Sequence, residues 1–233
     1  MFANVFVTIL AAASAVSAAA VSKNPTFTGL GTRYGGRCKE EDCWQKGACS
    51  FVDYKLPPGI DGSTCVSEDI WKNGANCGGC IQVSYKGKSL KIMVTNKTDP
   101  GNKNHLDMTP ATWSKLTNGL SAGGVQGIKW KWIECPLRKG TPLEVHMHGG
   151  ASKYWFAATI QSATHRVKAV DVSSDKGKTW KSTTLNDPNM WILKGTLPND
   201  TAWVRVKSVN NKQVIVKNVA LKSGVVTKGT ANF

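Results

Sequence analysis

An aspartate between two apolar residues is the side chain of this sequence best suited to acid–base chemistry. Asp107 stands between Leu106 and Met108, and apolar side chains that pack around a carboxyl group raise its pKa, which suits a general acid. Hydrolysis of a glycosidic bond also requires a second carboxyl group on the other side of the bond. A structural alternative stays open, in which Asp107 caps a helix that is expected to begin at Pro110.

Three consecutive aromatic residues, Tyr154, Trp155 and Phe156, could bind a sugar by stacking. Flat aromatic faces pack against apolar C–H surfaces, and an exposed cluster of them marks an interaction site. Successive strand residues point to opposite faces, so a regular strand would not expose all three. We expect Tyr154 and Trp155 to be exposed together at a strand start or a bulge. Burial of these aromatic residues in the core is the alternative.

Metal and redox chemistry find little support in the sequence. His146 and His148 alternate on one expected strand, but no third ligand joins them, so neither a metal nor a cofactor is expected. Seven cysteines occur, all within the first 135 residues: Cys38, Cys43, Cys49, Cys65, Cys77, Cys80 and Cys135. In an oxidising compartment they predict three disulfides and one unpaired cysteine, with the pairing open.

Residues 1–20 read as a signal peptide, since an uncharged apolar run leads to Val16-Ser17-Ala18, a typical cleavage site. The run is too short to span a bilayer, for which roughly 20 apolar residues are needed. Two N-glycosylation sequons, at Asn96 and Asn199, fit a secreted protein. The net charge of +15 favours acidic partners. Nucleic acid is not expected, because no nucleic-acid-binding motif occurs.

The elements that must position these residues are mostly strands. Alternating patterns predict strands over 80–85, 89–95 and 128–134 before a Pro- and Gly-containing linker at 135–142. A helix is predicted over 110–116 with Thr109 as its cap. After the linker, the predicted strands are 143–147, 167–172, 202–207 and 213–219, at the spacing of a small β-sandwich.

Five short motifs resemble the expansin family when they are taken in order. They are Thr32-Arg33-Tyr34-Gly35-Gly36, Gly47-Ala48-Cys49-Ser50-Phe51, Cys77-Gly78-Gly79-Cys80, Val94-Thr95-Asn96 and His105-Leu106-Asp107-Met108. The resemblance implies an all-β protein: a six-stranded double-psi β-barrel over residues 21–137, followed by an immunoglobulin-like β-sandwich over residues 141–233. The barrel of this family is related to the family-45 endoglucanases.

By this resemblance, Thr32, Tyr34, Asn96 and Asp107 line a polysaccharide groove in the first domain. The endoglucanases carry an aspartate base after the Thr-Arg-Tyr motif, where this chain has Gly35-Gly36 and no carboxylate until Glu40. Loss of a positioned base removes a factor of ~10²–10⁴ in rate, so the groove is expected to bind without hydrolysing. Asn96 stands where expansins usually have an aspartate, and a glycan there would obstruct the groove.

The second domain resembles a family-63 carbohydrate-binding module with a flat row of aromatic residues. Tyr154 and Trp155 match two neighbouring positions of that row, and Trp191 is the candidate for the third. The predicted function is that of a secreted, monomeric, non-hydrolytic wall-loosening protein, without membrane contact. Its expected partners are cellulose, xyloglucan or other wall polysaccharides, with acidic pectin and chitin as further candidates.

Two other functions stay open at this point. The first is an endoglucanase that uses Asp107 with Asp99 or with an acid from Glu40-Glu41-Asp42. The second is a secreted effector or wall protein that binds chitin or pectin by charge. Release of reducing ends would favour the first, and binding that is abolished by salt would favour the second.

Overall fold

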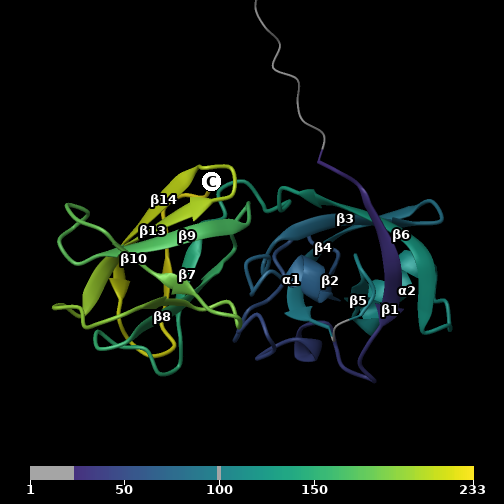
Figure 1. Ribbon diagram of the computed structural model, residues 1–233, viewed down its shortest axis with the longest axis horizontal. Helices are drawn as coiled ribbons and strands as arrows, with labels where there is room; N and C mark the ends of the chain where they lie inside the picture. Colours follow the sequence, from purple (N-terminus) through teal and green to yellow (C-terminus); the bar gives the residue numbers. More distant parts are fainter. Residues whose placement is uncertain (1–23, 99–100) are drawn as a thin grey trace, which may run out of the picture.

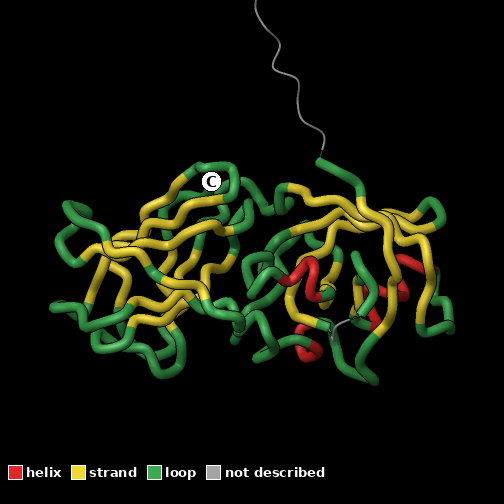
Figure 2. Tube along the Cα trace, viewed as in Figure 1, coloured by secondary structure: helices red, strands yellow, loops and turns green. Residues whose placement is uncertain are grey.

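Two β lobes lie side by side in the computed structural model, which describes residues 24–98 and 101–233. The first lobe, with the purple to teal strands, is a barrel, and the second is a sandwich (Figure 1). The expected signal peptide, residues 1–20, and Asp99 lie outside the described residues. Strands dominate both lobes, and the described helices are short segments of the barrel lobe (Figure 2). The predicted all-β class, a double-psi barrel followed by a sandwich, is confirmed.

Six strands close the barrel in the order β1-β5-β2-β4-β3-β6. They are β1 (Phe27–Arg33), β2 (Gly62–Val66), β3 (Cys80–Tyr85), β4 (Lys88–Lys97), β5 (Leu106–Met108) and β6 (Gly124–Ile133). The pairs β1–β5 and β2–β4 are parallel, and the other neighbours are antiparallel. All five residues of β2 are buried, as expected for a central strand that is covered on both faces.

The barrel lobe also holds η1 (Glu41–Cys43), α1 (Glu68–Trp71) and α2 (Pro110–Thr117). The predicted helix and its cap are confirmed, because the Thr109 side chain accepts a hydrogen bond from the Thr112 N–H and Pro110 occupies the first turn. Trp113 and Leu116 point into the core.

Nine strands form the two sheets of the second lobe. Their bounds are β7 (Glu144–Met147), β8 (Phe156–Gln161), β9 (Val167–Ser173), β10 (Lys181–Ser182), β11 (Thr184–Leu185), β12 (Trp191–Leu193), β13 (Thr201–Ser208), β14 (Gln213–Ala220) and β15 (Val226–Lys228). The sheets have the orders β10-β9-β13-β14 and β11-β12-β8-β7-β15. In β13 the buried side chains alternate with more exposed ones, which is the pattern that predicted this strand.

Three disulfides cross-link the barrel lobe and leave one thiol free, as the cysteine count predicted. The pairs are Cys38–Cys43, Cys49–Cys77 and Cys80–Cys135, and Cys65 is free and buried. The two cysteines of the Cys77-Gly78-Gly79-Cys80 motif bond to different partners, so the motif is structural here.

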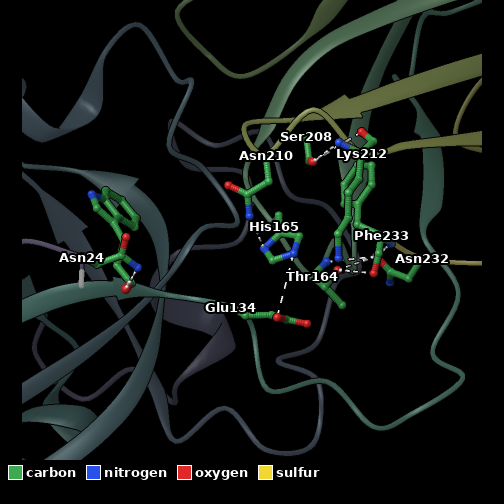
Figure 3. Close-up of polar contacts among 10 residues, drawn as sticks. Asn24, Glu134, Thr164, His165, Ser208, Asn210, Lys212, Asn232 and Phe233 are labelled. Carbon is green, nitrogen blue, oxygen red and sulfur yellow. Dashed lines mark hydrogen bonds and ion pairs between the residues drawn. The ribbon is translucent and has the colours of Figure 1, made fainter. Parts of the chain in front are cut away.

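The lobes are joined by direct polar contacts as well as by the linker. The Asn189 side chain donates to the Cys49 carbonyl at 3.0 Å, and the Cys135 N–H donates to the Thr164 carbonyl at 2.8 Å. Figure 3 shows Asn232 against Thr164, and His165 between Glu134 and Asn210. The C-terminal residues therefore hold the β8–β9 loop beside the linker. The predicted domain limits, 21–137 and 141–233, stay a prediction.

Candidate functional site

A row of side chains crosses four neighbouring strands of the barrel. Thr32 of β1 pairs with Asp107 of β5, Asp107 pairs with Cys65 of β2, and Cys65 pairs with Asn96 of β4. Residues paired in this way point to the same face of a sheet. The barrel thus brings three predicted groove residues, Thr32, Asn96 and Asp107, to one level, with the free Cys65 between them.

Asp107 is held by hydroxyl groups on this face. The Thr32 hydroxyl donates to Asp107 Oδ1, and Thr32 Oγ1 lies 2.7 Å from His105 Nε2. Burial raises the pKa of Asp107, while hydrogen bonds from Thr32 and Thr98 and the nearby His105 act in the opposite direction. Burial also lowers the pKa of His105. Burial therefore disfavours the charged forms of both Asp107 and His105.

The surroundings of Asp107 differ in one respect from the sequence interpretation. Leu106 and Met108 are fully buried in the core, on the opposite face of β5 from Asp107. Strand alternation separates them from the carboxylate, so its burial on the other face of β5, not these two neighbours, raises its pKa. Nor does Asp107 cap α2, because Thr109 does.

Tyr34 covers the middle of the row. It follows β1, where its N–H donates to the Met108 carbonyl at 3.0 Å. Its buried hydroxyl lies close to the Cys65 thiol. Burial raises the pKa of Tyr34 and raises that of Cys65 to about 12, so both groups are neutral. Sequence analysis missed Cys65 and His105; the signal for His105 was its two-residue spacing from Asp107.

Asn96 also holds a neighbouring loop. Its Oδ1 accepts from the Ala48 N–H at 2.8 Å and from the Lys97 N–H at 2.9 Å. A Cβ added at Gly47 would lie 2.7 Å from Asn96 Nδ2, so the loop approaches this amide closely. The side chain that begins the first sequon therefore accepts two hydrogen bonds through its Oδ1, and its Nδ2 lies against the loop at Gly47.

The other acids considered for hydrolysis are held away from such a role or lie outside the described residues. The Glu40 carboxylate accepts from the hydroxyls of Ser63 and Thr109, each at 2.5 Å, and from the Thr112 hydroxyl at 3.3 Å. Glu40 thus anchors the start of α2. Glu41 accepts from the Leu56 N–H at 3.3 Å, and Asp42 is exposed.

The second predicted site lies at the start of β8. Tyr154 is 69% exposed and Trp155 is 36% exposed, whereas Phe156, the first residue of β8, is 0% exposed. Ser152 and Trp155 form an isolated bridge just before β8. The side chains of Tyr154 and Trp155 are exposed at this bridge. His148 packs edge-on against Trp155, with ring centroids 5.3 Å apart. We call Tyr154 and Trp155 the aromatic pair.

Trp191 does not join the aromatic pair as an exposed side chain. It is 5% exposed and lies in β12, in the core of the sandwich. Its inclusion in the binding row rested on its position in the sequence, which does not reveal that β12 lies inside the sheet between β11 and β8. Trp180 and Trp203 are half-buried, and each carries a cationic side chain over its ring.

His146 and His148 have separate roles. His146 is buried and lies 3.0 Å from the Gln161 amide, whereas His148 contacts Trp155. Within residues 24–98 and 101–233, no group of three or more His, Cys, Asp or Glu side chains could hold a metal ion. None of the helices in the described part of the chain has the length and apolar character needed to cross a membrane.

Three sequence matches relate this chain to known proteins. The Expansin C-terminal domain family matches residues 143–220. Expansin-like protein 1 of Dictyostelium discoideum is 26% identical over 178 residues, which cover 73% of this chain and 61% of that protein. Expansin-B1 of Zea mays is 22% identical over 193 residues, or 74% of this chain and 70% of that protein. The match thus spans less than two thirds of the Dictyostelium protein.

Solved structures agree with the fold of both lobes. The crystal structure of a Clavibacter michiganensis expansin superposes with a TM-score of 0.75 at 18% identity, covering 89% of this chain and 98% of that chain. A mutant of that expansin, solved in complex with cellohexaose, gives a TM-score of 0.73 at 17% identity. The barrel, the sandwich, the family match in the second lobe and the curated relatives agree, and they show that this chain is similar to expansins in both lobes.

Proposed function

We propose that this expansin-like chain binds cellulose and related β-glucans and loosens noncovalent contacts between wall polysaccharides without cleaving them. The exposed aromatic pair is the observation that carries the proposal. Large aromatic side chains are rarely left in solvent without a partner, and two of them at one strand start offer a sugar ring a flat apolar face. The cellohexaose bound to the mutant Clavibacter expansin is a ligand of this class.

The groove around Asp107 is the second contact in this proposal. Thr32 and Asp107 present a hydroxyl and a carboxyl group that can hydrogen-bond to glucan hydroxyls, whereas the Tyr34 hydroxyl is buried. Hydrolysis would need two carboxyl groups that flank the bond, but Glu40 is bonded to the hydroxyls of Ser63, Thr109 and Thr112. We therefore assign the groove to binding and the protein to the non-enzymatic class.

Asn96 fits this role in a modified form. An amide can still bond to a sugar, but here it also holds the loop that begins at Gly47. We propose that Asn96 shapes the groove mainly through this loop. Xyloglucan, acidic pectin and chitin are further candidate partners.

The proposed location is the cell wall outside the cell. Three disulfides support an oxidising compartment, and the apolar stretch of residues 1–20 supports secretion.

The experiment that tests this function is a pull-down on microcrystalline cellulose at moderate salt with a parallel assay for reducing sugars. Trp155→Ala should weaken binding about thirtyfold, because a central aromatic anchor is typically worth about 2 kcal/mol. Trp203→Ala, at a half-buried aromatic residue of the same lobe, is the matched control and should bind like wild type. No sugar should be released by any variant.

Two outcomes would replace the proposal. Reducing ends that appear with wild type and vanish in Asp107→Asn would identify a hydrolase. Binding to cellulose or chitin that persists in Tyr154→Ala/Trp155→Ala and is eluted by salt would identify a charge-driven wall-binding protein.

A further inference from the structure

A cavity of about 600 Å³ lies between the two lobes. Neither Asp107 nor the aromatic pair lines it, so it is separate from the proposed glucan surfaces. We call it the interlobe cleft. Its lining residues come from both lobes, among them Phe27, Trp132 and Lys103 of the barrel lobe and Arg166, Lys168 and Trp191 of the sandwich lobe.

Aromatic side chains of the barrel form much of one wall. Phe27 stacks on Trp130 with ring centroids 4.4 Å apart, and Trp132 meets Trp130 edge-on at 5.6 Å. Trp191 adds a side chain from the sandwich, where it is nearly buried. These rings already pack against one another, so a ligand would lose little free energy in ordering them.

The charge of the cleft is strongly one-sided. Lys72, Lys103 and Lys168 are exposed at its lining, and Arg166 is half-buried. Asp69 is the acidic residue among the described lining residues, and both of its oxygens are engaged: Oδ1 accepts from the Ser67 hydroxyl at 2.5 Å and Oδ2 from the Asn104 N–H at 3.1 Å. The described lining residues therefore carry four cations against one carboxylate.

Arg166 is held in place by the barrel. Its guanidinium carbon lies 4.1 Å from the centroid of the Trp132 ring, and its Nη1 donates to Asn76 Oδ1 at 2.6 Å. Asn76 is buried and fixed in turn by a bond from its Nδ2 to the Ile70 carbonyl at 2.5 Å. A Cβ at Gly79 would lie 2.7 Å from Arg166 Cγ, so this glycine leaves the space that the arginine stem occupies.

The fixed guanidinium lacks an anion. No carboxylate of the described residues forms an ion pair with Arg166, and burial lowers its pKa. A guanidinium presents five N–H donors in a planar fork that matches a carboxylate. One of these donors is used by Asn76, and a half-buried cation without a counterion is costly.

We propose that the interlobe cleft binds a uronic-acid-containing saccharide. Its carboxylate would pair with Arg166, its neighbouring acid groups with Lys103 and Lys168, and the apolar face of a sugar ring would contact the partly exposed Phe27 and Trp132, which the buried Trp130 supports. A neutral glucan would leave the guanidinium unpaired, and an anion without a ring would leave the aromatic wall uncovered. This site does not depend on the function proposed above, because it uses none of the same residues.

Titration with short oligogalacturonides, followed by tryptophan fluorescence and by calorimetry, tests the proposal. Lys103→Gln/Lys168→Gln should weaken binding about fivefold, since each exposed ion pair contributes roughly 0.5 kcal/mol. Lys178→Gln/Lys194→Gln removes the same net charge from exposed positions outside the cleft and should bind like wild type. Arg166→Lys, checked for an unchanged thermal midpoint, should weaken binding about tenfold because the planar fork is lost.

Two comparisons separate a specific site from general charge attraction. Trp155→Ala should keep its affinity for oligogalacturonides, and an inorganic polyphosphate should compete poorly with them. Equal losses in the cleft and control lysine variants would overturn the proposal, as would equal binding of polyphosphate or the absence of measurable binding. A loss of binding in Trp155→Ala would also overturn it, because it would place the saccharide on the aromatic pair.

Discussion

In the barrel, Asp107 lies in a row of side chains contributed by four strands, whereas in the sandwich Tyr154 and Trp155 project from the start of a single strand. The first arrangement exists only while the whole barrel is closed. The second requires one local turn outward and a supporting sheet. The two regions also differ in their covalent support, because all three disulfides lie in or next to the barrel.

Removal of one long-range disulfide should give the largest difference between the regions. Cys80→Ala/Cys135→Ala opens a link across 55 residues, and such a loss typically costs about 2–5 kcal/mol. The barrel should unfold at lower denaturant than wild type, as followed by the fluorescence of its tryptophans. Cys38→Ala/Cys43→Ala, which opens a link across only 5 residues, should cost clearly less; equal costs would contradict the argument from loop length.

In the sandwich, the corresponding weak point is a buried ion cluster. The Asp171 carboxylate accepts from Arg205 at 2.8 Å and from Ser182 at 2.8 Å, and Lys207 lies at 3.2 Å. Asp171→Ala leaves these cations unpaired and should cost about 3 kcal/mol in denaturant unfolding. Asp200→Ala breaks only an exposed pair with Lys153 and should cost under about 1 kcal/mol.

The same cluster sets a pH dependence with a definite sign. Burial alone would raise the pKa of Asp171, but the bonds from Arg205, Ser182 and Lys207 outweigh it and lower the pKa. The folded value therefore lies below the unfolded one, so the stabilisation is present above the ordinary value of 3.8 and is lost as the pH falls through the folded value. Wild type should lose more stability on acidification than Asp171→Ala; parallel curves would contradict this.

Asp107 should behave in the opposite way, with a smaller effect. Its pKa is raised by burial, so its contribution to stability falls as the pH rises from the unfolded to the folded value. Asp107→Asn keeps an acceptor for Thr32 and should melt about 2 °C higher than wild type at neutral pH. That advantage should disappear below the ordinary pKa of 3.8. Lower stability of the variant at neutral pH would show that the carboxylate is a structural anchor.

The two sequons provide the test with the smallest expected effect. The sequon of the barrel, at Asn96, should carry no glycan. Asn96 is engaged through Ala48, Lys97 and the close approach of Gly47, whereas Asn199 is exposed. A glycan at Asn96 would displace the loop at Gly47, so folded protein from a secretory host should carry its glycan at Asn199. Peptide mass spectrometry before and after deglycosylation measures both occupancies. A stoichiometric glycan at Asn96 would show that this loop is not fixed by the amide.

Local features were predictable from the sequence, and features that depend on strand neighbours were not. The helix at Pro110 with its Thr109 cap depends on adjacent residues, as does the outward turn before Phe156, and these predictions are confirmed. The number of disulfides followed from the cysteine count, but their pairing depends on which strands meet. Cys65 was overlooked as a member of the row because β2 is buried throughout and carries no alternating pattern.

Burial was the harder property to predict. Trp155 directly precedes β8 and Trp191 begins β12, yet Trp191 is 5% exposed and Trp155 is 36% exposed. Trp191 lies on the face of its sheet that packs in the sandwich core, and no local pattern encodes which face that is. Likewise, Leu106 and Met108 were correctly recognised as apolar neighbours of Asp107, but strand alternation turns them away from it.

The buried thiol of Cys65 can report how often the barrel opens. Its thiol is shielded by the closed barrel, and its high pKa keeps it in the unreactive protonated form. A thiol-specific label can therefore reach it only when β2 separates from its neighbours, since local opening is what exposes such groups. The rate at which the label accumulates reports how often the barrel opens, without any engineered probe.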